Sequence, residues 1–174
     1  MSLDTPALRA LEGSGLTFEL IRTARPATAS ESASLQGIEL DHLLRTIVVR
    51  RGAGEYVLVL VPGGRQIDWP KLRSSLRVGR LSLPDADEAQ AATGYERGAI
   101  TPFGASGDWP VIADATIPSA GRVAIGGGDH GINIHVDADA LLAHLGAEVA
   151  DVTRPAAGSS APQAGPSPHR QRDP

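Results

Sequence analysis

The segment YVLVLVP, residues 56–62, limits the possible folds more than any other part of the chain. It follows a second apolar segment, RTIVVRR, residues 45–51, and the few residues around Gly52 and Gly54 join the two as a hairpin. An uninterrupted apolar run of this length is typical of a central strand buried on both faces of a sheet. We therefore expect a sheet built around this strand.

Capping residues and turn signals predict further elements on both sides of the hairpin. Asp68 and Asp137 are candidate N-caps, and another cap is expected near Ser30 or Ser32. Together these signals indicate an α+β domain. Helices are predicted at residues 5–12, 35–44, 68–76, 83–94 and 137–146, and strands at residues 16–22, 110–115, 122–126 and 132–136.

The C-terminal segment differs in composition from the rest of the chain. It reads RPAAGSSAPQAGPSPHRQRDP, is rich in Pro, Ser, Gly and Ala, and has almost no large apolar residue. Such a segment cannot bury a core. We therefore expect a single folded domain over residues 1–152 and a disordered tail over residues 153–174.

The composition excludes several classes of function. The chain has no cysteine, so disulfides, zinc–thiolate sites and a cysteine nucleophile are ruled out. The net charge of −4 argues against broad electrostatic binding of nucleic acid. The N-terminus lacks the pattern of a signal peptide, and no apolar window approaches about 18 residues. These features predict a soluble cytoplasmic protein.

The histidines and the glycine-rich segment GGGDHG are candidate ligand sites. None of the five histidines has a metal-ligand spacing with a carboxylate, so no metal is expected, and His135 is expected to face solvent from its strand. GGGDHG matches G-x-G-x-x-G, but a strand follows it where a dinucleotide site needs a helix. We expect a hairpin turn, whose consecutive N–H groups could face an anion or a carbonyl.

The segment GAITP, from Gly98 to Pro102, concentrates control of the backbone in five residues. Glycine allows unusual torsion angles, and proline fixes φ and withholds a donor. The segment is either a structural corner or a loop that aims its N–H and C=O groups at a ligand. Arg45, at the entrance of its strand, is likewise either a solvated charge or a functional cation.

The order of the segments RTIVV, VLVLVPGGRQID, KLRSSL, ATGYERGAITPFG, PVIADATI and GGGDHGINI resembles the YbaK/ProX family of aminoacyl-tRNA deacylases. It is also similar to the editing domain inserted in bacterial prolyl-tRNA synthetases. The resemblance covers residues 5–146 and implies a compact domain with a mixed central β-sheet flanked by helices.

The resemblance implies hydrolysis of the ester that joins a wrong small amino acid to the 3′ end of a tRNA, most often tRNA-Pro. The nucleophile would be water assisted by the substrate's 2′-hydroxyl, with no cofactor. The partners would be aminoacyl-tRNA and a synthetase, without membrane or DNA. The catalytic residues implied are Arg45, Gly98, Ala99, Ile100, Thr101 and Pro102, and the substrate-binding residues are Thr23, Leu44, Thr46, Tyr95, Phe103, Ile125, Gly126, Gly127 and Asn133.

The sequence departs from the family pattern at four of these positions. Arg45 stands where the family has a lysine, and Thr23 where a tyrosine follows the first strand. Gly126 and Asn133 replace a polar residue and an aspartate. The alternative is therefore a member that binds aminoacyl-tRNA or a synthetase without hydrolysis.

Two features of the pocket and its surroundings are also expected. The pocket walls are expected to be Leu44, Ile100, Phe103 and Ile125. The body of the tRNA would be recognised either by a synthetase partner or by a basic face near the pocket made of Arg50, Arg51, Arg73, Arg77 and Arg80.

Overall fold

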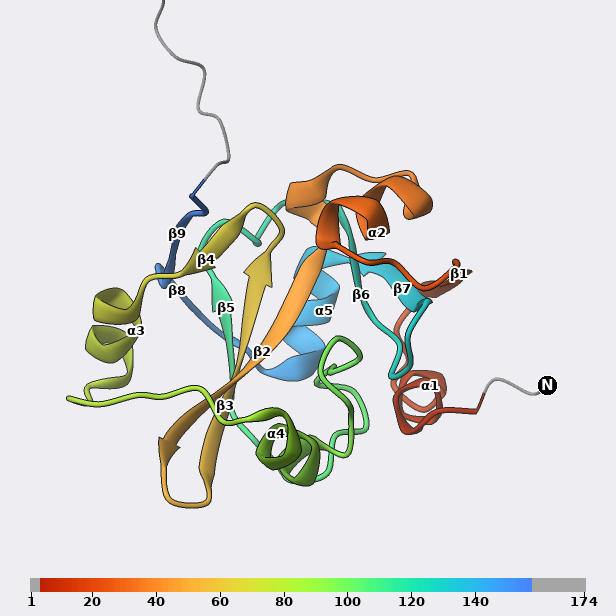
Figure 1. Ribbon diagram of the computed structural model, residues 1–174. Coiled ribbons are helices and arrows are strands. Elements are labelled where there is room, and N and C mark those ends of the chain that lie inside the picture. Colours follow the sequence, from red (N-terminus) through yellow and green to blue (C-terminus); the bar gives the residue numbers. More distant parts are fainter. Residues whose placement is uncertain (1–3, 158–174) are drawn as a thin grey trace, which may run out of the picture.

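The structure is a computed structural model that describes residues 4–157. Its centre is a mixed four-stranded sheet in the order β2-β3-β5-β8 (Figure 1). β2 and β3 form the predicted antiparallel hairpin, while β5 and β8 run parallel to their neighbours. The strands are β2 (Leu44–Gly52), β3 (Glu55–Pro62), β5 (Val111–Asp114) and β8 (Glu148–Ala150).

β3 is buried on both faces, as its apolar run predicts. Its residues Leu58 and Leu60 face one side of the sheet and belong to the main core, which the second sheet and α5 complete. Val57 and Val59 face the other side, where Leu72 of α3 covers them. Because burial stabilises by about 25 cal/mol per Å² of apolar surface, a strand that is buried on both faces contributes to both cores of the domain.

The second sheet is antiparallel, in the order β1-β7-β6. Its strands are β1 (Phe18–Arg22), β6 (Arg122–Gly126) and β7 (Ile132–Asp137). A single bridge between Leu43 and Ala124 joins this sheet to the free edge of β2. The glycine-rich segment between β6 and β7 is a hairpin turn, as predicted.

Short capped helices surround the two sheets (Figure 1). Thr5, Thr28, Asp68, Asp85 and Asp137 each accept a hydrogen bond from an N–H in the first turn of the helix that they precede. The helices are α1 (Pro6–Glu12), α2 (Ala29–Gln36), α3 (Trp69–Leu76), α4 (Ala86–Thr93) and α5 (Ala138–Leu145), with a 3-10 turn η1 (Leu40–His42). Within the described residues, none of the helices is long and apolar enough to span a membrane.

The expected boundary at residue 152 is wrong. Strand β9 (Thr153–Pro155) pairs with β4 (Arg65–Ile67) in a two-stranded antiparallel sheet. The Ala156 N–H continues the contact by donating to the Gly64 carbonyl at 2.9 Å. Ordered structure therefore runs past the predicted start of the tail, and the remainder, residues 158–174, lies outside the described residues.

The expected elements between residues 28 and 44 are also corrected. The N-cap of α2 is Thr28 and not Ser30 or Ser32. The helix ends at Gly37, whose left-handed conformation closes the last turn, so residues 35–44 are not one helix. Only the three-residue η1 follows before β2 begins at Leu44.

Candidate functional site

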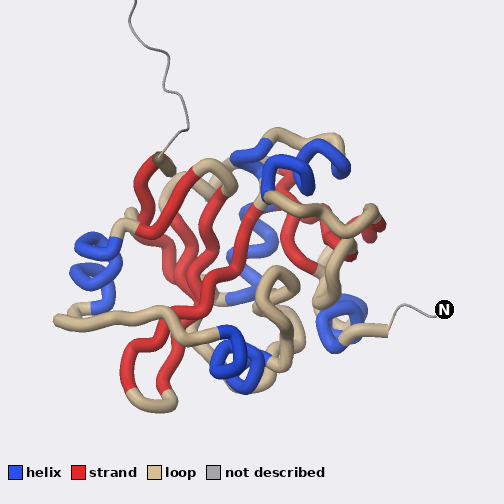
Figure 2. The backbone as a smooth tube through the Cα atoms, viewed as in Figure 1, coloured by secondary structure: helices blue, strands red, loops and turns tan. Residues whose placement is uncertain are grey.

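One cavity of about 490 Å³ opens along the free edge of β2. Four segments far apart in the sequence enclose it: the loop after α4, the start of α2, the β6–β7 turn, and β2 itself. Figure 2 shows that the chain between α4 and β5 is a long loop without helix or strand. The lining residues used below are Arg25, Leu44, Arg45, Thr46, Ile47, Arg97, Gly98, Ile100, Gly126, His130 and Asn133.

The edge of β2 presents backbone groups toward this opening. Gly63 N–H bonds to Leu43 O, while Arg50 exchanges two hydrogen bonds with Ser82 on the opposite edge. Because an antiparallel strand alternates the direction of its bonds, the even-numbered residues of β2 turn their N–H and C=O groups away from β3. Thr46 therefore offers a donor and an acceptor on the cavity side of the strand.

The GAITP loop has the constrained path that its glycine and proline predict. Gly98 has φ +91°, and a Cβ added there would lie 3.2 Å from Cε1 of His130. A Cβ added to Gly126 would lie 3.5 Å from the Ile100 carbonyl oxygen. The loop therefore packs against the β6–β7 turn, and Gly98 permits the approach because a side chain there would be strained and crowded, whereas a Cβ at Gly126 would make only an ordinary contact.

Three buried side-chain polar atoms in residues 4–157 have no hydrogen-bond partner: Arg45 Nε, Thr46 Oγ1 and His130 Nε2. All three residues line the same cavity. Glu96 approaches His130 Nε2 at 3.5 Å, which is an ion-pair contact without hydrogen-bond geometry. Buried polar groups are nearly always satisfied in folded proteins, so their collection in one place indicates a polar ligand.

Arg45 supplies a fixed cation at this cavity. Its Nη2 donates to the carbonyl oxygen of Arg65 at the start of β4. Burial lowers the pKa of the Arg45 guanidinium, yet the group stays charged because an arginine in a protein does not lose its proton. Arg45 is therefore a permanent donor and not a proton donor or acceptor in catalysis.

Seven of the predicted site residues line the cavity. The other eight are not among the lining residues. Thr101 is fully buried beneath the loop, and Thr23 bonds to the β6–β7 turn through its N–H, which donates to Gly131 O at 2.9 Å. Arg45, Gly98, Ile100, Leu44, Thr46, Gly126 and Asn133 line the cavity, and Ala99, Thr101, Pro102, Thr23, Tyr95, Phe103, Ile125 and Gly127 do not.

The expectation that Phe103 and Ile125 form the pocket walls is wrong. Both side chains belong to the main core, and the Phe103 ring stacks on His144 with centroids 5.9 Å apart. Tyr95 lies in the same core and donates its hydroxyl to Phe103 O at 2.6 Å, which ties down the end of the loop. These residues support the loop from behind.

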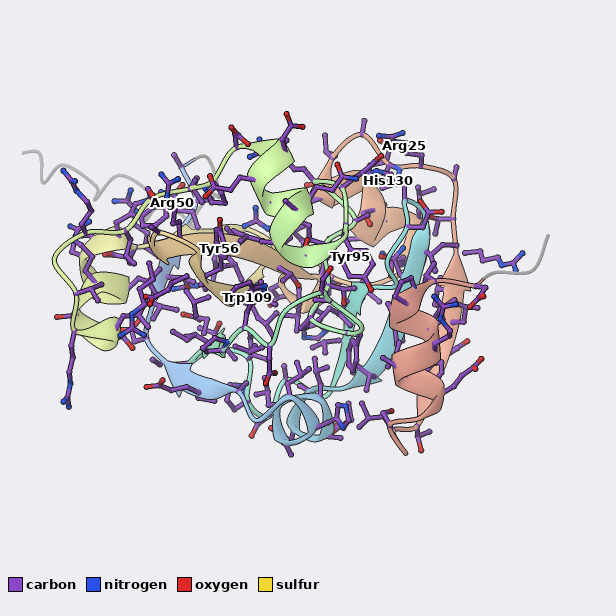
Figure 3. The ribbon with its side chains drawn as sticks, turned by 90° about the horizontal axis from the view of Figure 1, so that it is seen from below. Arg25, Arg50, Tyr56, Tyr95, Trp109 and His130 are labelled. Atoms are coloured by element: carbon purple, nitrogen blue, oxygen red, sulfur yellow. The ribbon has the colours of Figure 1, made fainter. Side chains whose placement is uncertain are left out.

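The expected basic face near the pocket is also wrong. Arg50 pairs with Glu88 at 3.0 Å and lies well apart from Arg25 and His130, toward the side of the molecule that carries α3 (Figure 3). None of the five arginines chosen from the sequence is among the described residues that line the cavity. Arg25 and Arg97 line it instead, and both side chains are exposed.

The sequence patterns predict no role for His130, and the expectation that His135 faces solvent is wrong. His130 lies in the glycine-rich turn that was expected to face an anion, and this was the available signal. His135 is buried: its Nδ1 accepts from Arg122 Nε at 3.2 Å, and its Nε2 lies 3.0 Å from Gln36 Oε1 of α2. Burial, and then the charge of Arg122, lower the pKa of His135, so the ring is neutral and holds α2 to the sheet.

Comparison with known proteins places this cavity in a family context. The sequence model of the aminoacyl-tRNA editing domain matches residues 23–144. A proline–tRNA ligase of Thermosipho melanesiensis is 28% identical over 124 residues, which are 70% of this chain but 22% of the ligase. The chain thus spans about a fifth of that relative. EbsC of Enterococcus faecalis, described as a Cys-tRNA(Pro)/Cys-tRNA(Cys) deacylase, is 23% identical over 72% of this chain and 77% of its own length.

Solved structures agree with the sequence match. The crystal structure of a hypothetical protein has a TM-score of 0.80 at 25% identity and covers 86% of this chain and all of its own. A structure described as a trans-editing enzyme for prolyl-tRNA synthetase has a TM-score of 0.78 at 28% identity, over 88% of this chain and 99% of that one. Because the family model covers well over half of the sequence, the chain belongs to the aminoacyl-tRNA editing domain family, among its YbaK-like members.

Proposed function

We propose that this protein is a trans-editing deacylase, which hydrolyses the ester between a small amino acid and the 3′ end of a mischarged tRNA. The observation that carries the proposal is the convergence of Arg45 Nε, Thr46 Oγ1 and His130 Nε2, all unpartnered, on one cavity beside the Gly98 loop. An aminoacyl ester on a terminal ribose offers several acceptors and donors to such a set. The cavity volume lies in the range of about 300–1,000 Å³ that is usual for small-ligand sites.

The reaction needs no side-chain nucleophile. Water adds to the ester carbonyl, the bond between the carbonyl carbon and the ribose oxygen breaks, and this oxygen leaves with a proton. The products are a free amino acid and a tRNA with its 3′ end restored. The permanently charged Arg45 can neither take nor give a proton, and we assign the proton relay to the substrate's 2′-hydroxyl, as the family resemblance implies.

Fixed donors stabilise the negative charge that develops on the carbonyl oxygen. Arg45 and Thr46 line the cavity together with Gly98, so the guanidinium and the outward backbone N–H of Thr46 are the candidate donors. Donors held in place before the reaction cost no reorganisation in the transition state, and loss of one typically lowers the rate about 10²–10³-fold. The exchange of lysine for Arg45 keeps this charge and adds a planar group that can bind bidentately.

The amino-acid side chain would rest on the apolar part of the lining, where Leu44, Ile47 and Ile100 meet. Cysteine and alanine on tRNA-Pro are the first candidates, and cysteine is in keeping with what EbsC is described to act on. The binding pocket of a synthetase discriminates only weakly between amino acids that differ by one methylene. A second site that hydrolyses the wrong ester supplies the remaining selectivity. The exposed Arg25 and Arg97 at the cavity would contact phosphates of the acceptor end.

A deacylation panel tests the proposal. Purified protein is mixed with tRNA-Pro carrying Cys, Ala or Pro, and with other tRNAs carrying small residues, and release of the amino acid is followed. We expect faster release than in buffer for at least one small mischarged residue, with Pro-tRNA-Pro spared. Binding of charged tRNA without release would favour the non-hydrolytic alternative, and neither binding nor release would reject both.

A further inference from the structure

The guanidinium of Arg45 is held by a group outside the cavity. Its Nη2 donates to the carbonyl oxygen of Arg65, the first residue of β4. In the described chain β4 pairs only with β9, so the position of this carbonyl depends on the C-terminal strand. β9 lies beyond the stretch that the family model matches.

The side chain of Arg65 ties its own backbone to β9. Nε of Arg65 donates to the Thr153 hydroxyl at 2.7 Å, and Nη2 lies 3.4 Å from the Thr153 carbonyl oxygen. Thr153 is fully buried. Nε of Arg65 also lies 3.9 Å from Oδ2 of the buried Asp114, so Arg65 contacts both Thr153 and this carboxylate.

Asp114, at the end of β5, is the anchor of this chain of bonds. Its carboxylate is only 1% exposed and accepts from the Thr116 hydroxyl at 2.5 Å, the Thr116 N–H at 3.1 Å and the Val152 N–H at 3.2 Å. Burial alone would raise the pKa of Asp114, but the hydrogen bonds from Thr116, Thr153 and Val152 outweigh it and lower this pKa. A buried carboxylate in this state stays ionised and fixes the groups around it.

We propose that Thr153, anchored by Asp114, positions Arg45 through Arg65, so that β9 completes the candidate site from behind. The inference rests on the proposed function for the role of Arg45. Without the bond to the Thr153 hydroxyl, the Arg65 side chain keeps only the longer contacts to the Thr153 carbonyl oxygen at 3.4 Å and to Asp114 at 3.9 Å. The Arg65 carbonyl is then held less firmly, and the Arg45 guanidinium gains rotational freedom. Thr153, Arg65 and Asp114 are positioning residues, since none of them lines the cavity.

A pair of threonine variants isolates this role. Thr153→Val removes the hydroxyl that accepts from Arg65 Nε, whereas Thr116→Val removes a hydroxyl that binds Asp114 but does not contact Arg65. We expect Thr153→Val to lower kcat about tenfold, because misplacing a catalytic group by a fraction of an ångström has effects of that order. KM should change less than about twofold, Thr116→Val should keep the wild-type kcat, and Thr153→Ser should recover most of the loss.

A double-mutant cycle shows whether the effect passes through Arg45. In an Arg45→Ala background, Thr153→Val should change the residual rate less than about twofold, because the group that it positions is gone. An undiminished tenfold loss in that background would mean that Thr153 acts on the fold in general. Equal losses in Thr153→Val and Thr116→Val would overturn the proposal in the same way.

Nuclear magnetic resonance of the arginine side chains decides the inference without any activity. We expect slow rotation about the Nε–Cζ bond of Arg45 in the wild type and in Thr116→Val, and faster rotation in Thr153→Val. Unchanged rotation in Thr153→Val would overturn the positioning role even if the deacylase is active. A wild type that releases no amino acid, with the expected change in rotation, would reject the proposed function and leave the positioning of Arg45 established.

Discussion

Replacing Gly98 by alanine tests the loop directly, because the structure gives both the backbone strain and the steric contact. Gly98 has φ +91°, a region in which an L-residue with a Cβ is strained by about 1–2 kcal/mol. The new Cβ would also lie 3.2 Å from Cε1 of His130. Relief of this contact requires that the loop or the His130 ring moves, and both line the cavity.

Stability and activity should respond very differently to this substitution. A loss of about 1–2 kcal/mol lowers the unfolding midpoint of a domain of this size by about 2–8 °C. A contact of 3.2 Å is relieved by a shift of about a few tenths of an ångström, and a shift of that size at a site that orients a reacting ester lowers the rate about tenfold. We therefore expect Gly98→Ala to remain folded at 25 °C while kcat/KM for release of the amino acid falls about tenfold.

Gly54→Ala is the matched control for this comparison. Gly54 also has a positive φ, +69°, but its added Cβ meets no atom within 4 Å, and it lies in the β2–β3 hairpin turn away from the cavity. The midpoints of both variants are measured by thermal unfolding, and their rates by release of labelled amino acid. Equal rates for Gly98→Ala and Gly54→Ala would refute the argument that the loop geometry serves the reaction.

Three further perturbations give separate outcomes. Arg45→Ala should lower the deacylation rate about 100-fold while Arg50→Ala, which breaks the pair with Glu88 on the far end of β2, leaves it within about twofold. The pKa of His135 is lowered because the folded state resists protonation of the ring. The free energy of unfolding, measured with urea, should therefore fall as the pH drops below about 6.5. His135→Gln should remove this part of the pH dependence. Asp114, whose pKa is lowered, acts in a more acidic range of pH. Its contribution to the free energy of unfolding is full above about pH 4 and is lost as the pH falls through the lowered pKa. Asp114→Asn should therefore destabilise the protein at pH 7 and flatten the acid limb of the same titration.

The sequence predicted the elements that carry local signals. The apolar run of β3 determined the hairpin and the central position of the strand, and Asp68 and Asp137 marked two helix starts because their caps are local hydrogen bonds. β4, β8 and β9 were missed because each is only three residues long and is stable only through pairing with distant segments. β9 in particular begins a Pro-rich stretch whose composition favoured disorder.

The candidate site shows the same division. The close approach of the loop at Gly98 followed from glycine and proline chemistry, while the position of His130 depends on how the β6–β7 turn packs against that loop. The sequence does not distinguish whether Phe103 and Ile125 face the pocket or the core. Both are apolar residues near the site, and periodicity does not separate the two orientations over so short a span. The bond from Arg45 to Arg65 joins two sheets and has no local signal at all.

The most direct test of the central claim is a crystal structure with a non-hydrolysable substrate end, 3′-alanylamino-3′-deoxyadenosine. We predict that the amide carbonyl lies between the Gly98 loop and the edge of β2, with Arg45 and His130 within hydrogen-bond distance of the analogue. Two results would contradict the account. The analogue could bind in the second cavity, which Pro62, Arg65 and Pro118 line, or it could bind without contacting Arg45 and His130.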